Sequence, residues 1–173
     1  MRELGGRSHV FAHNGYLAGI DTNSQFALGA DRPVGQTDSE HAFCALLARM
    51  RPSWGNAGPP PLEARLALLA AFAADLRELG AANFLYADGD ALFAHGHRRL
   101  TKLGGPVEPP GLWLLQRQSA PADPAPVHAA GIVAEHGNDA AMFIASVPLT
   151  DEAWRPLREG ELLAVRDGMV ISP

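Results

Sequence analysis

The spacing of apolar residues changes at residue 83, and this change constrains the fold more than any other feature of the 173-residue chain. Before it, residues 37–50 and 62–79 carry large apolar side chains every three or four positions, which predicts two helices that each bury one face. After it, short apolar runs alternate with turn signals, as in antiparallel strands. Two helices followed by hairpins predict an α+β fold.

Both expected helices have recognisable ends. The first begins at Thr37-Asp38-Ser39-Glu40, where a threonine N-cap and a glutamate three residues later form a capping box, and it ends at Arg51-Pro52. The second begins with Pro61 in its first turn and ends near Gly80, a residue suited to a helix C-terminus. The glycine- and proline-rich stretch between the helices is expected to be a loop.

The expected strands are short, and tight turns join several of them. One bent strand or two short strands are predicted over His9–Leu17, interrupted at His13-Asn14-Gly15. Hairpins are predicted at Asp88-Gly89 and at Asp167-Gly168, because Asp-Gly favours the type I′ turn. Further strands are predicted over 112–116, 129–135 and 140–147, the last two joined by a turn at 136–139, whereas 118–126 looks loose.

Length, charge and cysteine content limit the class of protein. One domain over residues 1–173 fits a chain of this size. A net charge of -5 without any block of lysine and arginine does not suit binding to nucleic acid or to anionic lipid. No apolar stretch approaches the roughly 20 residues that span a membrane, and residues 1–6 do not resemble a signal peptide. A single cysteine, Cys44, excludes an internal disulfide, so we expect a cytoplasmic protein.

Two short motifs have both a structural and a chemical interpretation. The amide of Asn14 and the backbone N–H of Gly15 can point at one small volume and hold an oxyanion, and Gly15 lets a substrate approach the backbone. The same Asn-Gly pair is typical of an ordinary turn. Asp38 lies in the first turn of a helix, where the helix dipole stabilises a carboxylate, or where it can receive the ammonium group of a ligand.

The other polar candidates have structural explanations. Cys44 lies in the first helix beside the apolar face formed by Phe43 and Leu47, so we expect a core thiol. His95 and His97 fall on one face of a strand but have no acidic or thiol partner nearby in the sequence. We therefore expect surface histidines there rather than a metal site. No metal and no cofactor are predicted.

Five segments, taken in order, resemble the class-II glutamine amidotransferases, and most closely their stand-alone bacterial branch: residues 11–15, 35–40, 83–89, 145–154 and 160–165. The His-Asn-Gly and Thr-Asp-Ser-Glu motifs are the specific part, and the Pro-Leu-Thr-Asp-Glu-x-Trp stretch ending at Trp154 points to the branch. The resemblance implies an N-terminal-nucleophile hydrolase fold with four layers, α, β, β and α. It also implies glutamine or a γ-glutamyl small molecule as the substrate.

By the same resemblance, Asn14 and Gly15 would form the oxyanion hole, Asp38 would bind the α-ammonium group of glutamine, and His13 would shape the substrate pocket beside them. The family's nucleophile is an N-terminal cysteine whose own α-amino group acts as general base, and the reaction proceeds through a thioester. Here Met1 is not followed by cysteine, and Cys44 lies within a helix. No arginine matches the one that pairs with the substrate α-carboxylate in related proteins.

We therefore expect the chain to be the C-terminal portion of a longer class-II domain, lacking the leading strands and the nucleophile, and inactive by the family mechanism as it stands. Two hypotheses of different class remain. One is an amidohydrolase core that acts when a cysteine segment is present. The other is a catalytically silent domain that binds a glutamine-like ligand or another protein. The sequence identifies neither an oligomeric state nor a partner subunit.

Overall fold

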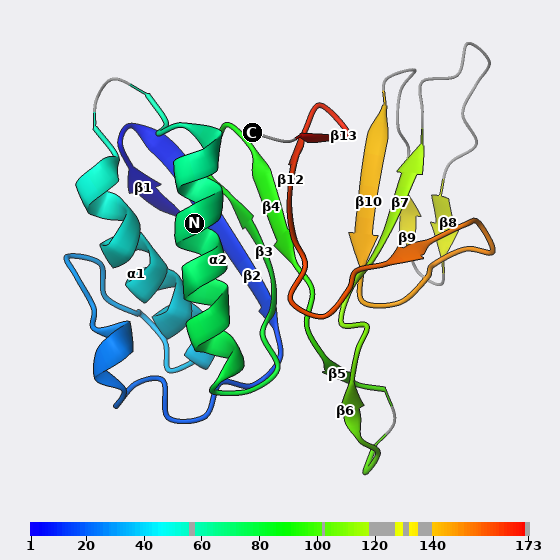
Figure 1. Cartoon of the computed structure of the whole chain (residues 1–173), viewed down its shortest axis with the longest axis horizontal. Helices are drawn as coiled ribbons and strands as arrows, with labels where there is room; N and C mark the ends of the chain where they lie inside the picture. The colour runs from blue at the N-terminus through cyan, green and yellow to red at the C-terminus, as the bar shows by residue number, and fades with distance from the viewer. Residues whose placement is uncertain (56–57, 102, 118–126, 130–131, 135–139, 172–173) are drawn as a thin grey trace.

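Two α-helices lie side by side on one face of a six-stranded antiparallel sheet, and a three-stranded sheet lies on its other face (Figure 1). These elements are seen in a computed structural model that describes residues 1–55, 58–101, 103–117, 127–129, 132–134 and 140–171. The helices are α1 (Asp38–Met50) and α2 (Leu62–Arg77), with short 3-10 turns at Ser24–Phe26 and Arg51–Ser53.

The central sheet has the strand order β1 (Arg2–Leu4), β2 (Arg7–Asn14), β3 (Asn83–Ala87), β4 (Leu92–His95), β12 (Leu162–Arg166) and β13 (Met169–Ile171). The sheet on its far face, called the second sheet below, has the order β10 (Ala141–Ala145), β7 (Trp113–Arg117) and β11 (Arg155–Pro156). Two further pairs are β5 (Arg99–Leu100) with β6 (Val107–Glu108), and β8 (Val127–Ala129) with β9 (Ile132–Ala134).

Successive residues of the central strands pack into two separate cores, because side chains alternate across a strand. In β3, Phe84 and Tyr86 pack against the helices, whereas Leu85 contacts the second sheet's core. In β4, Phe93 likewise packs against the helices, whereas Ala94 belongs to the second sheet's core. The described residues thus form three layers, α, β and β, which confirms the α+β prediction; the second helical layer of the expected four-layer sandwich stays a prediction.

The start of α1 confirms the predicted N-cap but only half of the capping box. The Thr37 hydroxyl accepts a hydrogen bond from the Glu40 N–H at 3.2 Å. The Glu40 carboxylate turns instead to the preceding loop, where it accepts hydrogen bonds from the N–H groups of Val34 and Gly35 at 2.8 and 2.7 Å and pairs with Arg2. These partners hold the pKa of Glu40 below its ordinary value and fix the loop against the helix.

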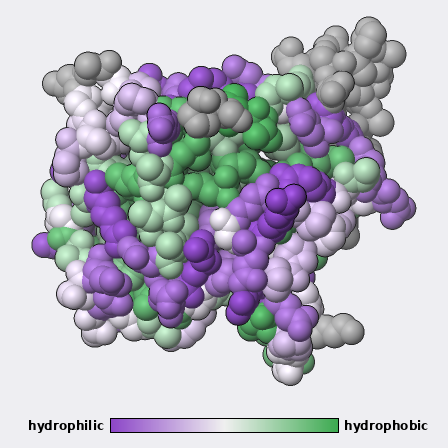
Figure 2. All heavy atoms as spheres, in the orientation of Figure 1, coloured by the Kyte–Doolittle hydropathy of each residue, from purple (hydrophilic) through white to green (hydrophobic). Residues whose placement is uncertain are grey.

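Helix α2 is apolar on both faces. Its inner face buries Leu69, Phe72 and Leu76, as the predicted stripe requires. Its exposed positions include the alanines 64, 67, 70 and 71. Figure 2 accordingly shows apolar residues, in green, over α2 and the strands beside it. The helix ends at Arg77 with Glu78 as its C-cap, so Gly80 is not the C-cap residue.

Only one of the two predicted Asp-Gly turns has the predicted form. Asp167 and Gly168 are a two-residue loop with φ of 50° and 70°, which fits type I′ and confirms that prediction. The prediction for Asp88-Gly89 is right about the hairpin and wrong about the turn, because Ala87 pairs with Leu92 and leaves a four-residue loop. The Asp88 carboxylate shapes this loop by accepting hydrogen bonds from the N–H groups at positions 90 and 91.

The remaining strands depart from prediction in their pairing. Strand β2 ends at Asn14, and Leu17 forms an isolated bridge with Gly80 instead of continuing the strand. The single strand predicted over 129–135 is replaced by the β8–β9 pair, and β10 pairs with β7. Strand β1 was not predicted. The predicted turn at 136–139 and the loose stretch at 118–126 lie outside the described residues.

The prediction that His95 and His97 are surface histidines is wrong. His95 is 0% exposed: its Nδ1–H donates to the Ala82 carbonyl at 2.7 Å, and its Nε2 accepts from Arg77 at 3.1 Å. His97 is also buried, and its Nδ1 accepts from the Ala82 N–H at 3.3 Å. Burial, aided by the Arg77 charge, lowers the pKa of His95 to about 4. Both rings are therefore structural groups of the β4 region.

The first testable prediction follows from the lowered pKa of His95. The unfolded chain protonates this ring near its ordinary pKa of 6.5, and the folded chain only near 4. The contribution of His95 is therefore complete above pH 6.5 and is lost as the pH falls to about 4, on the order of 3 kcal/mol. Urea unfolding at pH 7 and near pH 4 measures this loss. Between pH 7 and pH 4, His95→Asn, which keeps a donor for Ala82, should lose less stability than the wild type loses. An equal loss in the two proteins would contradict the prediction.

The second prediction concerns the buried ion pair of α2 with the β3–β4 loop. Arg65 is 4% exposed and its guanidinium donates to Asp88, 0% exposed, at 2.7 Å and to Asp90 at 2.8 Å. Arg65→Met leaves the Asp88 carboxylate buried without its cation, so we expect the free energy of unfolding to fall by about 3 kcal/mol.

The matched control is Arg51→Met, which breaks the more exposed pair with Asp31. It should cost less than about 1 kcal/mol in the same urea titration. Similar losses in both variants would show that burial does not set the strength of the Arg65 pair.

Candidate functional site

Strand β2 ends with two residues that point to opposite faces of the central sheet. His13 faces α1, where its Nδ1 lies 3.0 Å from the Ser39 hydroxyl, and its Nε2–H donates to the Ala81 carbonyl at 3.0 Å. Asn14 faces the second sheet, and its side-chain amide donates to the Ser146 hydroxyl, directly after β10, at 2.8 Å. The end of one strand therefore contacts both layers that cover the central sheet.

Asn14 and Gly15 present two adjacent donors. One N–H of the Asn14 side chain goes to Ser146, and the other has no partner among the described residues. The Gly15 backbone N–H likewise has none in the part of the chain that the structure describes. Both residues are exposed. Two free donors on consecutive residues are the arrangement that the oxyanion interpretation of the sequence needs.

The backbone of Asn14 is held by a buried asparagine. The Asn83 side chain, 1% exposed, donates to the carbonyls of Asn14 at 3.0 Å and Arg98 at 2.6 Å and accepts from the His97 N–H at 2.7 Å. A Cβ on Gly111 would lie 1.6 Å from the Asn83 oxygen. Asn83 was not predicted to act at this site, although an asparagine inside a predicted strand was a usable signal, because strands are depleted in asparagine.

Gly15 is required for a different reason from the one expected. A Cβ at this position would lie 1.8 Å from the Ala81 carbonyl oxygen. The chain's own backbone therefore makes the close approach for which a substrate was expected. Gly80, in the facing segment, is required for the same reason, since a Cβ at this position would lie 2.1 Å from the Tyr16 carbonyl oxygen. The two glycines let the segment after β2 run directly against the segment after α2.

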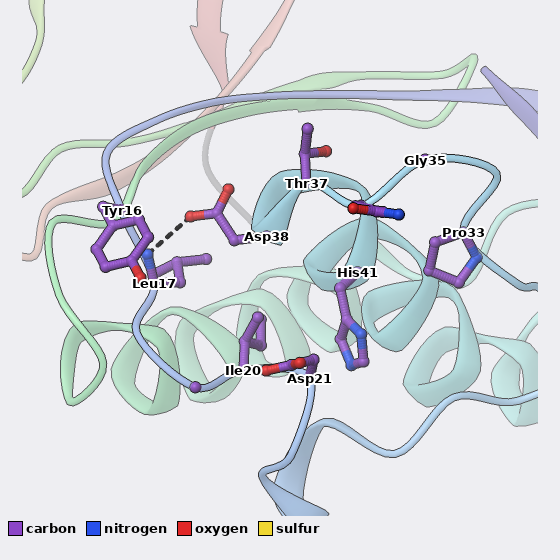
Figure 3. Close-up of a pocket in the computed structure, with 11 residues that line it drawn as sticks. Tyr16, Leu17, Ile20, Asp21, Pro33, Gly35, Thr37, Asp38 and His41 are labelled. Atoms are coloured by element: carbon purple, nitrogen blue, oxygen red, sulfur yellow. Dashed lines mark hydrogen bonds between the residues drawn. The ribbon is translucent and has the colours of Figure 1, made fainter.

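Asp38 is fixed at the start of α1 and faces a separate cavity. One carboxylate oxygen accepts from the Leu17 N–H at 2.8 Å (Figure 3). The other accepts from the N–H of its neighbour Ser39. The cavity has a volume of about 630 Å³ and is lined also by Asp21 and His41. We call it the Asp38 cavity. Among the described residues, its lining includes two carboxylates and no arginine or lysine, so its charge suits a cation.

Asn14 lines a smaller cavity of about 190 Å³, called here the Asn14 cavity, together with His13 and Ser146. The structure thus places Asn14 and Asp38 in different cavities, on opposite faces of the central sheet. Gly15, Tyr16 and Leu17 connect them along the chain. A ligand that contacts both residues must reach from one cavity to the other.

Cys44 is in the core, as predicted. It is 0% exposed within α1, and burial raises the pKa of its thiol. Neither property suits a nucleophile. Among the described residues, no group of three or more histidine, cysteine, aspartate or glutamate side chains could hold a metal ion.

None of the helices that the structure describes is long and apolar enough to cross a membrane.

Comparisons by sequence and by structure both find proteins named as glutamine amidotransferases. The family described as glutamine amidotransferases class-II matches residues 1–172. The Escherichia coli protein YafJ is 32% identical over 166 residues, and a Methanocaldococcus jannaschii protein is 32% identical over 179. The crystal structure of a predicted glutamine amidotransferase from Pseudomonas aeruginosa matches 99% of this chain with a TM-score of 0.77 and 37% identity.

A class-II domain protein from Silicibacter pomeroyi, at 20% identity and a TM-score of 0.55 over 94% of this chain and 66% of that one, shares the fold. The matched part of this chain is 92% for YafJ and 99% for the Methanocaldococcus protein. It spans only 58% and 45% of those two relatives and 63% of the Pseudomonas chain. The chain thus covers about half to two-thirds of the proteins that it resembles.

Proposed function

Because this chain belongs to the class-II glutamine amidotransferases, we propose that it supplies the oxyanion hole and the ammonium-binding carboxylate of an enzyme that hydrolyses the γ-amide of glutamine or of a γ-glutamyl compound. The observation that carries the proposal is the pair of free donors at the end of β2. The Asn14 amide and the Gly15 N–H can both donate to an oxygen that becomes negatively charged when a carbonyl is attacked.

The other site residues take roles that their contacts support. Asp38 faces an acidic cavity and keeps lone pairs beyond those used by Leu17 and Ser39, so it can accept from a substrate ammonium. His13 has both ring nitrogens bonded inside the protein, to Ser39 and to Ala81. We therefore assign His13 to positioning of the strand end beside the substrate.

The proposed chemistry needs a thiol other than Cys44, because Cys44 is buried in α1. In this mechanism a cysteine sulfur attacks the γ-carbonyl carbon, and Asn14 and Gly15 stabilise the oxyanion. The amide C–N bond then breaks, the amine leaves with a proton, and water cleaves the thioester to release glutamate. An N-terminal cysteine segment, outside these 173 residues, is the proposed source of the sulfur.

The proposal extends to the architecture. Residues 1–173 would be the C-terminal portion of one domain of the stand-alone bacterial branch. A second helical layer would cover the second sheet and complete the four-layer sandwich. The α, β and β layers already seen support this arrangement.

Ligand binding tests the role of Asp38 without catalysis. The third prediction is that L-glutamine binds more tightly than glutaric acid monoamide, which lacks the ammonium group, by about tenfold, the scale of a charge-assisted hydrogen bond. In Asp38→Asn, which keeps an acceptor for Leu17, the two ligands should bind equally. NMR titration of the Gly15 N–H and the Asn14 side-chain amide measures both affinities, weak ones included.

Asp21→Asn is the matched control, because Asp21 lines the same cavity. This variant should keep the preference for glutamine. A preference that survives Asp38→Asn would exclude Asp38 as the ammonium ligand.

Catalysis tests the oxyanion hole. The fourth prediction is that the chain without a cysteine segment releases no ammonia from glutamine, whereas a form that carries an N-terminal cysteine segment does. Asn14→Ala should slow that form by about 100-fold or more, as loss of an oxyanion-hole donor does elsewhere. Ammonia release from the chain alone, abolished by Asn14→Ala, would show that no further thiol is needed. Full activity in the Asn14→Ala form would remove Asn14 from the oxyanion hole.

A further inference from the structure

The two faces of β2 fix the direction in which a substrate must lie, given the proposed function. Asp38 belongs to the layer of α1, on the face to which His13 points. The Asn14 side chain points to the opposite face and to Ser146. If the ammonium group lies at Asp38 and the γ-carbonyl oxygen at Asn14 and Gly15, the group on the amide nitrogen extends away from Asp38. This arrangement would place that group on the side of the second sheet, to which the Asn14 side chain points.

The space on that side is the Asn14 cavity, and none of the described residues that line it is acidic. Leu112 and Ile144 give it apolar walls, and Asn14 and Ser146 supply its polar groups. At about 190 Å³ it can hold a group the size of a small amino acid. Its character therefore differs from that of the Asp38 cavity, where two carboxylates line the wall.

Arg99, in β5, contacts Ser146, one of the residues that line this cavity. Its Nη1 donates to the backbone carbonyl of Ser146, the residue whose hydroxyl accepts from Asn14. The side chain is partly buried, and its other N–H groups have no partner among the residues that the structure describes. A guanidinium stays charged at any physiological pH and presents its donors as a planar fork that fits a carboxylate.

We propose that the Asn14 cavity is the subsite for the leaving amine and that Arg99 selects γ-glutamyl compounds whose leaving amine carries a carboxylate, such as γ-glutamyl amino acids and peptides. In the proposed reaction the γ-amide C–N bond breaks and the amine takes up a proton. The released product is then an amino acid or peptide, whose carboxylate Arg99 binds. Free glutamine releases only ammonia and leaves Arg99 without an anion.

The fifth prediction compares two ligands that differ in this carboxylate. γ-L-Glutamylglycine should bind more tightly than γ-L-glutamylethylamide, a neutral amide of similar size, by about fivefold, the scale of a partly exposed ion pair. Arg99→Met should abolish the difference, and Arg99→Lys, which keeps the charge, should retain part of it. The readout is NMR titration of the Gly15 N–H and the Asn14 side-chain amide.

Arg98→Met is the matched control, because the neighbouring Arg98 pairs with Glu159 at 2.6 Å. It should leave the preference unchanged. Equal binding of the two ligands, or a preference that persists in Arg99→Met, would overturn the assignment of Arg99. The proposed function would still stand in that case if Asp38→Asn weakens the binding of both ligands. If neither ligand shifts the Asn14 and Gly15 signals, the proposed function is wrong and the leaving-group subsite with it.

Discussion

The site depends on the three hydrogen bonds of the buried Asn83 side chain. A buried amide costs free energy unless its donors and acceptor are bonded, so it tolerates little change in what surrounds it. Asn83 satisfies both donors with the carbonyls of Asn14 and Arg98 and its acceptor with the His97 N–H. These bonds fix where β2 ends. They also place Arg98, and hence Arg99 beside it, relative to Asn14.

A second set of contacts links the strand end to the helix layer. The first three residues of α1 each bond a different segment: Asp38 accepts from Leu17, Ser39 contacts His13, and Glu40 accepts from the loop at 34–35. The start of α1 therefore cannot move without moving the backbone that carries Asn14 and Gly15. A substitution at Asp38 affects structure as well as ligand binding, and an asparagine separates the two effects because it keeps the acceptor for Leu17.

What could be predicted from the sequence depended on local signals. The helices, the N-cap at Thr37, the core position of Cys44 and the Asp167-Gly168 turn follow from residues within a few positions of one another. The failures involve partners far along the chain. The loop at Asp88 depends on the ion pair with Arg65, and the burial of His95 depends on Arg77 and Ala82. The pattern of apolar residues in β3 and β4 does not indicate these contacts.

The same limit applied within the site. Asn14, Gly15 and Asp38 were candidates because their motifs are local. A glycine is needed at position 15, however, because the carbonyl of Ala81 lies against it, and that residue is 66 positions further along the chain. Nor could the sequence show that Asn14 and Asp38 line different cavities. That outcome follows from strand geometry: successive side chains point to opposite faces, so His13 meets α1 and Asn14 meets the second sheet. The end of β2 therefore lies between the acidic Asp38 cavity on one face and the proposed Arg99 subsite on the other. The proposed preference for ligands with an ammonium group at one end and a carboxylate at the other would arise from the register of β2, since a one-residue shift would exchange the two faces.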